Sequence, residues 1–175
     1  INCQTRALEL TETVEMKAAL YINRGNAYTE KREFDNAERD YDRAVSLHPS
    51  SVLYYRRGLA RRKWGNVAGA IADYDRALEL GPPDPSIYYA RGNARYERDE
   101  HQKALFDYTR AIDLEPGYTA AYVNRGTVRK DMGDFSGAVE DYTRALKFVP
   151  DHAQLYYSRA FAFVKLGAVR QGVAD

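Results

Sequence analysis

Residues 21–49 read YINRGNAYTEKREFDNAERDYDRAVSLHP, and most of the chain repeats this pattern with few changes. Glycine recurs at positions 25, 58, 92 and 126, in steps of 33, 34 and 34 residues, and Ala160 takes the same place 34 residues later. Three more columns keep these steps: Ala37, Ala70, Ala104 and Ala138; Tyr41, Tyr74, Tyr108 and Tyr142; Pro49, Pro82, Pro116 and Pro150. A period in this range indicates stacked copies of one structural unit rather than a single globular core.

Each copy contains two helical patterns, because apolar or small residues recur at helical spacing in both halves. Asp35, with Glu38 three residues later, has the pattern of a capping box and predicts the start of a second helix. The proline column follows each second helix and ends it. We predict helices at 19–31 and 35–48, 52–64 and 68–80, 86–98 and 102–115, 119–132 and 136–149, and 153–166, with a further stub from 170.

The turns between paired helices also contain a repeated position. Glycine occupies the turn in three copies, at Gly65, Gly133 and Gly167, which suits the left-handed backbone at a helix end. Arg32 and Asp99 take the same place in the other two copies. We expect those two turns either to adopt another geometry or to carry a small strain.

The period also sets the domain organisation. The repeat array covers residues 18–175, in units 18–50, 51–84, 85–118, 119–152 and an incomplete 153–175. Residues 5–10 (TRALEL) match residues 75–80 (DRALEL) closely. We therefore predict that residues 1–17 are the end of a preceding repeat helix plus a connection.

The composition excludes several function classes. The 175 residues are 45% hydrophobic and 29% charged with a net charge of +1, so no bulk field favours nucleic acid or a membrane surface. No apolar run approaches the roughly 20 residues of a membrane span, so no membrane partner is expected. The chain opens on Ile1, so we expect a fragment or a processed form. A soluble protein is expected and the cytoplasm is favoured, although nothing in the sequence names a compartment.

The repeated pattern resembles the signature of the tetratricopeptide repeat family, carried in the first copy by Tyr21, Arg24, Gly25, Tyr28, Ala37, Tyr41, Ala44 and Pro49. The resemblance covers residues 18–175, and its regular arginines and aspartates suggest a bacterial-like subclass. It implies an all-α fold, a right-handed α-α superhelical solenoid of antiparallel helix pairs whose first helices line a concave groove. Family members usually bind peptide segments of partner proteins there.

The clearest departure from that signature is an arginine in every copy where leucine is usual. The column is Arg24, Arg57, Arg91, Arg125 and Arg159, and aspartates recur in step at Asp40, Asp73, Asp107, Asp141 and Asp175. A second arginine column lies three residues past the aspartate, at Arg43, Arg76, Arg110 and Arg144. We interpret these columns as a repeated Arg–Asp–Arg network that braces the helices. A ladder for phosphate or carboxylate ligands is disfavoured, because ligand-binding positions normally vary between copies.

The positions that do vary lie on the predicted groove face, around the arginine column at helical spacing. Variation on a fixed scaffold suits a recognition surface, and tyrosines are typical of binding hot spots. The alternative is that these side chains only pack between neighbouring first helices. The predicted partner-binding groove comprises Asn23, Asn26, Tyr55, Arg56, Leu59, Arg62, Tyr89, Asn93, Tyr96, Val123, Asn124, Thr127, Tyr157 and Phe161.

One known ligand mode of the family is not expected here. In the carboxylate clamp, three consecutive units hold the acidic C-terminus of heat-shock chaperones with lysine, asparagine and arginine. Asn93 and Asn124 match the asparagine places, but Tyr89, Gln154 and Ser158 stand where the clamp requires cations. Without those charges, a buried carboxylate would be poorly stabilised.

A basic cluster in the second unit comprises Arg56, Arg57, Arg61, Arg62 and Lys63. It could attract an acidic partner segment or a nucleic-acid backbone. We favour a solvated helix in which Arg57 pairs with Asp73. Nucleic acid is unexpected, because the basic character does not continue along several units.

No enzymatic chemistry is predicted. The histidines His48, His101 and His152 lie far apart, and no two have the spacing of metal ligands. Cys3 is the only cysteine, which excludes an internal disulfide, and it has no histidine or aspartate partner in its segment. No glycine-rich phosphate loop occurs. We therefore predict no catalytic site, no metal and no cofactor.

The leading hypothesis is a protein–protein interaction scaffold that holds a peptide or helical segment of a partner in its groove. The alternative is a self-assembly element that forms oligomers through exposed repeat ends. It rests on the incomplete last unit, where Phe161, Phe163 and Val164 lack a terminal polar cap. A third hypothesis is the binding of an acidic or nucleic-acid ligand by the basic second unit.

Overall fold

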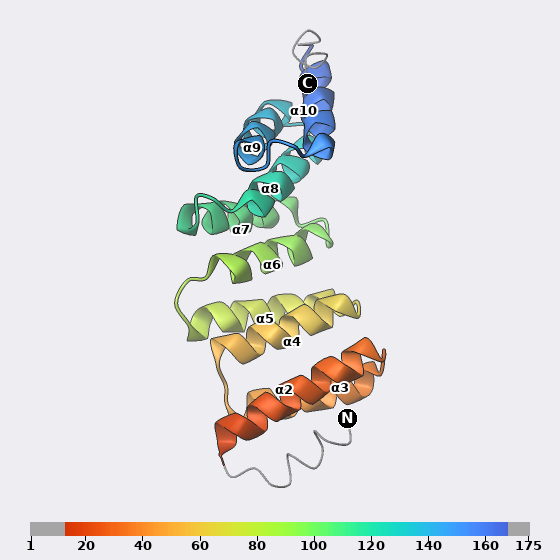
Figure 1. The fold of residues 1–175 in the computed structure, drawn as a ribbon, viewed down its shortest axis with the longest axis vertical. Coiled ribbons are helices and arrows are strands. Elements are labelled where there is room, and N and C mark those ends of the chain that lie inside the picture. The colour runs from red at the N-terminus through yellow and green to blue at the C-terminus, as the bar shows by residue number, and fades with distance from the viewer. Residues whose placement is uncertain (1–12, 168–175) are drawn as a thin grey trace. The chain divides into compact units, whose positions relative to one another are not determined.

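The computed structural model describes residues 13–167, and all its regular secondary structure in that range is helical (Figure 1). The predicted end of a preceding repeat helix, at residues 5–10, and the predicted stub from 170 lie outside the described residues. The chain divides into two compact units that are larger than the single repeats: the first ends at Pro83 and the second begins at Asp84. Below, the first and second units are these two parts of the chain. The helices are α2 (Val14–Glu30), α3 (Phe34–Leu47), α4 (Ser51–Lys63), α5 (Val67–Leu80), α6 (Pro85–Tyr96), α7 (His101–Leu114), α8 (Thr119–Asp131), α9 (Phe135–Phe148) and α10 (Ala153–Lys165).

In each unit, consecutive helices pack as antiparallel pairs joined by short turns. Figure 1 shows α2 lying along α3 and α4 along α5 in the first unit, where α2 also contacts α4. The second unit pairs α6 with α7 and α8 with α9, and α10 packs on α9. The predicted all-α architecture of helix pairs is confirmed.

The predicted helix boundaries are confirmed to within two residues, with one exception. The first helix begins at Val14, five residues before the predicted start, and the hydroxyl of Thr13 accepts from the backbone N–H of Met16 at 3.3 Å. Residues 14–17, predicted as a connection, are therefore helical. The local reason is that Thr13 is itself an N-cap and Glu15 favours the first turn.

The predicted capping box at Asp35 is wrong. Helix α3 begins one residue earlier, at Phe34, so Asp35 lies inside its first turn and Glu33 is the N-cap residue. The equivalent N-caps of α5 and α9 are Asn66 and Asp134, and their side chains do accept a backbone hydrogen bond. The second helices thus start one residue before the position that the sequence pattern favoured.

The turns inside the helix pairs share one backbone conformation. Gly65, Gly133 and Gly167 have φ of 93°, 82° and 76°, while Arg32 and Asp99 have φ of 62° and 59°. Both non-glycine turns therefore adopt the left-handed conformation rather than a different geometry. Of the two expected alternatives, the small strain is the one found.

The core of each unit is built where a tyrosine of the second helix packs on a glycine of the first. Tyr41 and Tyr74 are almost fully buried in the first unit. A Cβ added to Gly58 would lie only 2.6 Å from the Tyr74 ring. A Cβ at Gly92 in the second unit would lie 2.8 Å from Tyr108. The periodic glycines are thus required by the close approach of two helices.

Buried aspartates tie each first helix to its second. The carboxylate of Asp107 is fully buried and accepts from Arg91 Nη2 at 2.6 Å and from Arg95 Nη1 at 2.8 Å. Asp73 is bound in the same way by Arg57 and Arg61. The predicted pairing of the two columns within each copy is confirmed for the pairs Arg24–Asp40, Arg57–Asp73, Arg91–Asp107 and Arg125–Asp141.

The second arginine of the network was predicted wrongly. It comes from the first helix, four residues after the first arginine, as Arg61, Arg95 and Arg129. The predicted residues lie on the second helix, where Arg43 stacks over the ring of Tyr21 and Arg76 pairs with the exposed Glu79. The physical reason is that the aspartate side chain points into the helix pair, whereas a residue three positions later points out of it.

Candidate functional site

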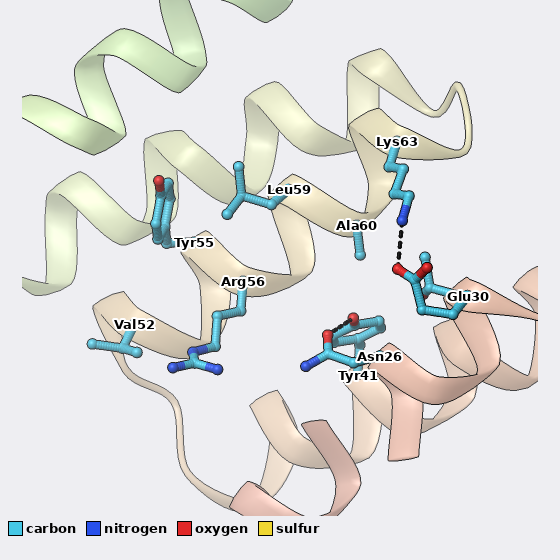
Figure 2. A pocket seen from close by; sticks show the side chains of 10 residues that line it. Asn26, Glu30, Tyr41, Val52, Tyr55, Arg56, Leu59, Ala60 and Lys63 are labelled. Carbon is cyan, nitrogen blue, oxygen red and sulfur yellow. Dashed lines mark hydrogen bonds and ion pairs between the residues drawn. The ribbon is translucent and has the colours of Figure 1, made fainter. Parts of the chain in front are cut away.

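The first unit contains a pocket of about 510 Å³ between α2 and α4. Figure 2 shows the side chains that surround it. Most come from α4, and the rest come from α2 and from one tyrosine of α3. The lining residues are Asn26, Thr29, Glu30, Tyr41, Val52, Tyr55, Arg56, Leu59, Ala60 and Lys63.

One wall of the pocket is apolar. Val52 and Leu59 are 57% and 39% exposed, although both are large aliphatic side chains. Tyr55 lies beside them, and its ring packs on that of Tyr74 with the centroids 6.0 Å apart. Because these residues lie on one face of α4, they form a continuous apolar surface that faces the pocket.

The polar side of the pocket comes from α2 and α3. The Tyr41 hydroxyl donates to Asn26 Oδ1 at 2.5 Å. Burial raises the pKa of Tyr41, so this phenol is protonated at neutral pH and remains a donor. The Asn26 carbonyl is therefore occupied, whereas no described residue accepts a hydrogen bond from its Nδ2 amide.

Two cations line the pocket, Lys63 and Arg56, and they differ in whether a carboxylate pairs with them. Lys63 Nζ and Glu30 Oε1 form an ion pair at 2.5 Å that connects α4 to α2. Arg56 is exposed and extends from α4 into the pocket, where its guanidinium lies between Val52 and Asn26 in the view of Figure 2. Its positive charge opposes the upward pKa shift of Tyr41, which places the guanidinium within electrostatic reach of that hydroxyl. Within residues 13–167, Arg56 forms no ion pair.

The rest of the basic cluster is largely committed elsewhere. Arg57 pairs with Asp73, as predicted, and also with Asp42 at 2.7 Å. Arg61 binds Asp73 and Glu38. The cluster is therefore mostly part of the structural ion network, and only Arg56 and Lys63 of its five cations line the pocket.

The structure brings four of the predicted site residues together in this pocket: Asn26, Tyr55, Arg56 and Leu59. Asn23 is exposed on α2 and Arg62 is partly buried on α4, and neither lines the pocket. Val52 was missed by the sequence reasoning. Its spacing of three and seven residues before Tyr55 and Leu59 places it on the same helical face and would have identified it.

In the second unit, three of the predicted residues form an internal hydrogen-bond network between α6 and α8. Asn124 Nδ2 donates to Asn93 Oδ1 at 2.7 Å and to the Tyr89 hydroxyl at 3.1 Å. Asn93 Oδ1 also accepts from the hydroxyl of Tyr108 at 2.8 Å. The polar groups of these side chains are thus used to join neighbouring repeats.

Three more predicted residues of the second unit form internal bonds. Tyr96 donates to Asp131 Oδ2 at 2.5 Å, and this bond, with burial, raises the pKa of Tyr96 to about 12. Thr127 Oγ1 donates to the backbone carbonyl of Val123 at 3.0 Å. Val123 itself is half-buried and packs against the core around Tyr142.

The last two predicted residues lie on α10 and are exposed. Tyr157 is 68% exposed and Phe161 is 41% exposed. Tyr157 lines a hollow of about 390 Å³ together with Ala153, Tyr156 and Ala160.

Residues 13–167 contain no group of three or more His, Cys, Asp or Glu side chains placed to hold a metal ion. None of their helices is both long and apolar enough to cross a bilayer.

Family models match most of the chain. A model described as a TPR repeat matches residues 58–98 and 126–167, and two described as tetratricopeptide repeat match residues 18–51 and 85–118. No curated protein matches the sequence significantly.

Solved structures with the same fold cover nearly the whole chain. A crystal structure of MamA is 26% identical, with a TM-score of 0.84 over 90% of this chain and 86% of that one. YrrB, described as a TPR protein with an unusual peptide-binding site, is 22% identical, with a TM-score of 0.79 over 98% of this chain and 87% of that one. A tetratricopeptide repeat protein from Parabacteroides merdae is 19% identical, with a TM-score of 0.79 over 98% of this chain and 67% of that one.

These matches agree with the fold built from the sequence. Each of the four glycine–tyrosine contacts lies within a stretch that a family model matches, and the helix pairs have the architecture of the matched structures. The chain is a protein-interaction module that belongs to the tetratricopeptide repeat family.

Proposed function

We propose that the first unit binds a peptide segment of a partner protein in the pocket between α2 and α4. The observation that carries this proposal is the exposed apolar wall of Val52, Tyr55 and Leu59 beside hydrogen-bond donors of α2 and α4. Mixed surfaces of this kind, with an aromatic anchor and convergent polar groups, are typical of recognition sites. The volume of about 510 Å³ lies within the range of ligand pockets.

Tyr55 is the anchor that we expect to contribute most apolar contact. Its ring is held against Tyr74 and therefore loses little side-chain freedom when a partner binds. Val52 and Leu59 flank it and present aliphatic surface that a partner side chain would cover. Peptide binding in YrrB is a property of that protein, and the likeness to it supports this proposal only through the shared fold.

The test uses a displayed library of random 12-residue peptides, selected on the whole chain. Selected peptides are then measured on Leu59→Ala and on Leu114→Ala by fluorescence anisotropy. Both leucines are 39% exposed, but only Leu59 lines the pocket. We expect Leu59→Ala to weaken binding about tenfold, or about 1.4 kcal/mol, and Leu114→Ala to leave it unchanged. Equal affinities for the two variants would refute the pocket as the binding site.

Self-assembly is a second candidate, favoured by the exposed aromatic and aliphatic side chains of α10. Tyr157, Phe161 and Val164 are 68%, 41% and 50% exposed. Apolar side chains grouped in this way often mark an interface. If α10 joins two copies, light scattering gives a dimer mass that Phe161→Ser reduces to that of a monomer. A monomer mass at high concentration rules this candidate out.

A further inference from the structure

We propose that the pocket between α2 and α4 recognises a carboxylate, supplied by an aspartate or glutamate side chain of the partner's peptide segment. Arg56 and the Asn26 Nδ2 amide are the groups that bind it. This inference rests on the proposed function and adds the chemistry of the ligand.

The first argument is the balance of donors and acceptors in the pocket. The Asn26 carbonyl accepts from Tyr41, and the carboxylate of Glu30 is paired with Lys63. The Thr29 hydroxyl donates to the backbone carbonyl of Gly25 at 2.9 Å. Apart from the Tyr55 hydroxyl, which can donate and accept, the polar groups that the described lining side chains leave for a ligand are the Arg56 guanidinium and the Asn26 amide N–H groups. Both only donate, so the complementary group is an acceptor.

The second argument is the charge of Arg56. Its neighbours Arg57 and Arg61 are bound by Asp73, Asp42 and Glu38, whereas Arg56 forms no ion pair within residues 13–167. A guanidinium binds a carboxylate through two parallel hydrogen bonds, which are stronger than bonds between neutral groups. A bound peptide would also exclude water from the pocket and strengthen this attraction.

The third argument is the equivalent place in the second unit. Asn124 stands 68 residues after Arg56, in the same column, and Asn93 stands 67 residues after Asn26. There, Asn124 Nδ2 donates to Asn93 Oδ1 at 2.7 Å and uses its own donor to join the repeats. In the first unit, Arg56 does not bond to Asn26, so both donors remain available to a ligand.

A protein segment fits this surface better than a nucleic acid. A phosphate backbone requires a row of available cations, but Arg57, Arg61 and Lys63 are each held by carboxylates. The apolar wall of Val52 and Leu59 also lies directly beside Arg56 on α4. We therefore expect an acidic side chain next to an apolar one in the bound peptide.

The experiment uses those library peptides whose binding depends on Leu59. Each aspartate or glutamate is replaced in turn by asparagine or glutamine, and affinities are measured on the wild type and on Arg56→Gln. We expect one replacement to weaken binding to the wild type about tenfold or more and to have no effect on Arg56→Gln. Arg56→Lys should retain part of the preference for the acid, because it keeps the charge but loses the bidentate geometry.

Arg39→Gln is the matched control. Arg39 is an exposed arginine of the same unit that does not line the pocket, so the variant changes the net charge equally. It should bind the acidic peptides as the wild type does, and circular dichroism should show unchanged helicity in all variants. Equal losses in Arg39→Gln and Arg56→Gln would mean a bulk charge effect and overturn the inference.

Two further outcomes separate this inference from the proposed function. Peptides that depend on Leu59 but contain no acidic residue would overturn the carboxylate and leave peptide binding intact. A labelled 20-nucleotide single strand that binds the wild type and not Arg56→Gln would assign Arg56 to phosphate and overturn it too. If no selected peptide depends on Leu59, the proposed function fails and the inference fails with it.

Discussion

The face between α2 and α4 in the first unit and the face between α6 and α8 in the second are built from the same columns and differ in outcome. Asn26 and Asn93 both accept a hydrogen bond from the tyrosine behind them. The next repeat then supplies Arg56 in one unit and Asn124 in the other. Asn124 bonds to Asn93, whereas Arg56 extends into a pocket.

This comparison shows that the residue at one variable position changes the contacts that are made at the face. An asparagine reaches its neighbour with a neutral hydrogen bond and joins the two repeats. An arginine carries a charge on a longer side chain, and Arg56 makes no such bond to Asn26 within the described residues. The scaffold beneath is unchanged, because the buried tyrosine, the glycine and the arginine–aspartate pair recur in both units.

The largest expected effect comes from breaking that shared scaffold. Asp107→Ala removes a fully buried carboxylate and leaves Arg91 and Arg95 without their common partner. We expect the free energy of unfolding to fall by about 3–5 kcal/mol, as for other broken buried ion pairs. Urea denaturation measures it, with Asp113→Ala as the control, since Asp113 is 53% exposed and, among the described residues, pairs with Arg110 alone. A loss below about 1 kcal/mol would show that the network is not structural.

A smaller effect distinguishes the two faces directly. Asn124→Ala removes two hydrogen bonds between repeats, so we expect a loss of about 1–2 kcal/mol in unfolding free energy. Arg56→Ala, at the equivalent position, should change stability by less than about 0.5 kcal/mol, because Arg56 is exposed. Chemical denaturation of both variants gives the difference. Equal losses would mean that Arg56 also serves the scaffold and would weaken its assignment to a ligand.

The sequence predicted the scaffold well because scaffold positions repeat. The tyrosine ring packs so closely on the glycine that a larger residue would crowd it, and this contact recurs in each copy from Gly25 to Gly126. The helix boundaries and the Arg57–Asp73 pair follow from the same regularity. The second arginine was misplaced because two arginine columns lie at comparable helical spacing, and only the direction of the aspartate side chain distinguishes them.

The roles of the variable positions could not be predicted from the sequence in the same way, because they depend on neighbouring side chains in the next repeat. Tyr89 and Tyr55 stand in the same column and both were predicted as groove residues. Tyr55 lines the pocket, whereas Tyr89 accepts a hydrogen bond from Asn124. That difference depends on the reach of a side chain 35 residues away, which spacing along one helix does not reveal.

The two units can also be compared at the turns that have a non-glycine residue, where we expect a smaller effect on stability. Arg32 and Asp99 both adopt the left-handed conformation, with φ of 62° and 59°. Aspartate tolerates this region better than arginine, so Arg32→Gly should stabilise the chain by about 0.5–1 kcal/mol and Asp99→Gly by less. Thermal and urea unfolding of the two variants test this order. A larger gain from Asp99→Gly would contradict it.

The smallest expected effects on the free energy of unfolding come from one contact at the end of each face. In the first unit, Lys63 of α4 pairs with Glu30 of α2. In the second unit, Tyr96 of α6 donates a hydrogen bond to Asp131 of α8. The first contact is exposed, so Lys63→Met should cost less than about 1 kcal/mol, and 1 M salt should remove the effect. The second contact depends on pH instead. The hydrogen bond to Asp131, followed by burial, raises the pKa of Tyr96 from 10.0 to about 12.

Because the folded pKa of Tyr96 lies above the unfolded value, its contribution to stability is complete below pH 10. It is lost as the pH rises from 10 to 12, where the phenol must lose its proton and give up the bond to Asp131. Tyr96→Phe should therefore unfold slightly more easily at pH 8, and its stability should fall less steeply between pH 10 and 12 than that of the wild type. Urea denaturation at closely spaced pH values measures both slopes. If the unfolding free energies of the wild type and Tyr96→Phe fall with the same slope between pH 10 and 12, then the proton of Tyr96 does not contribute to stability and this prediction is wrong.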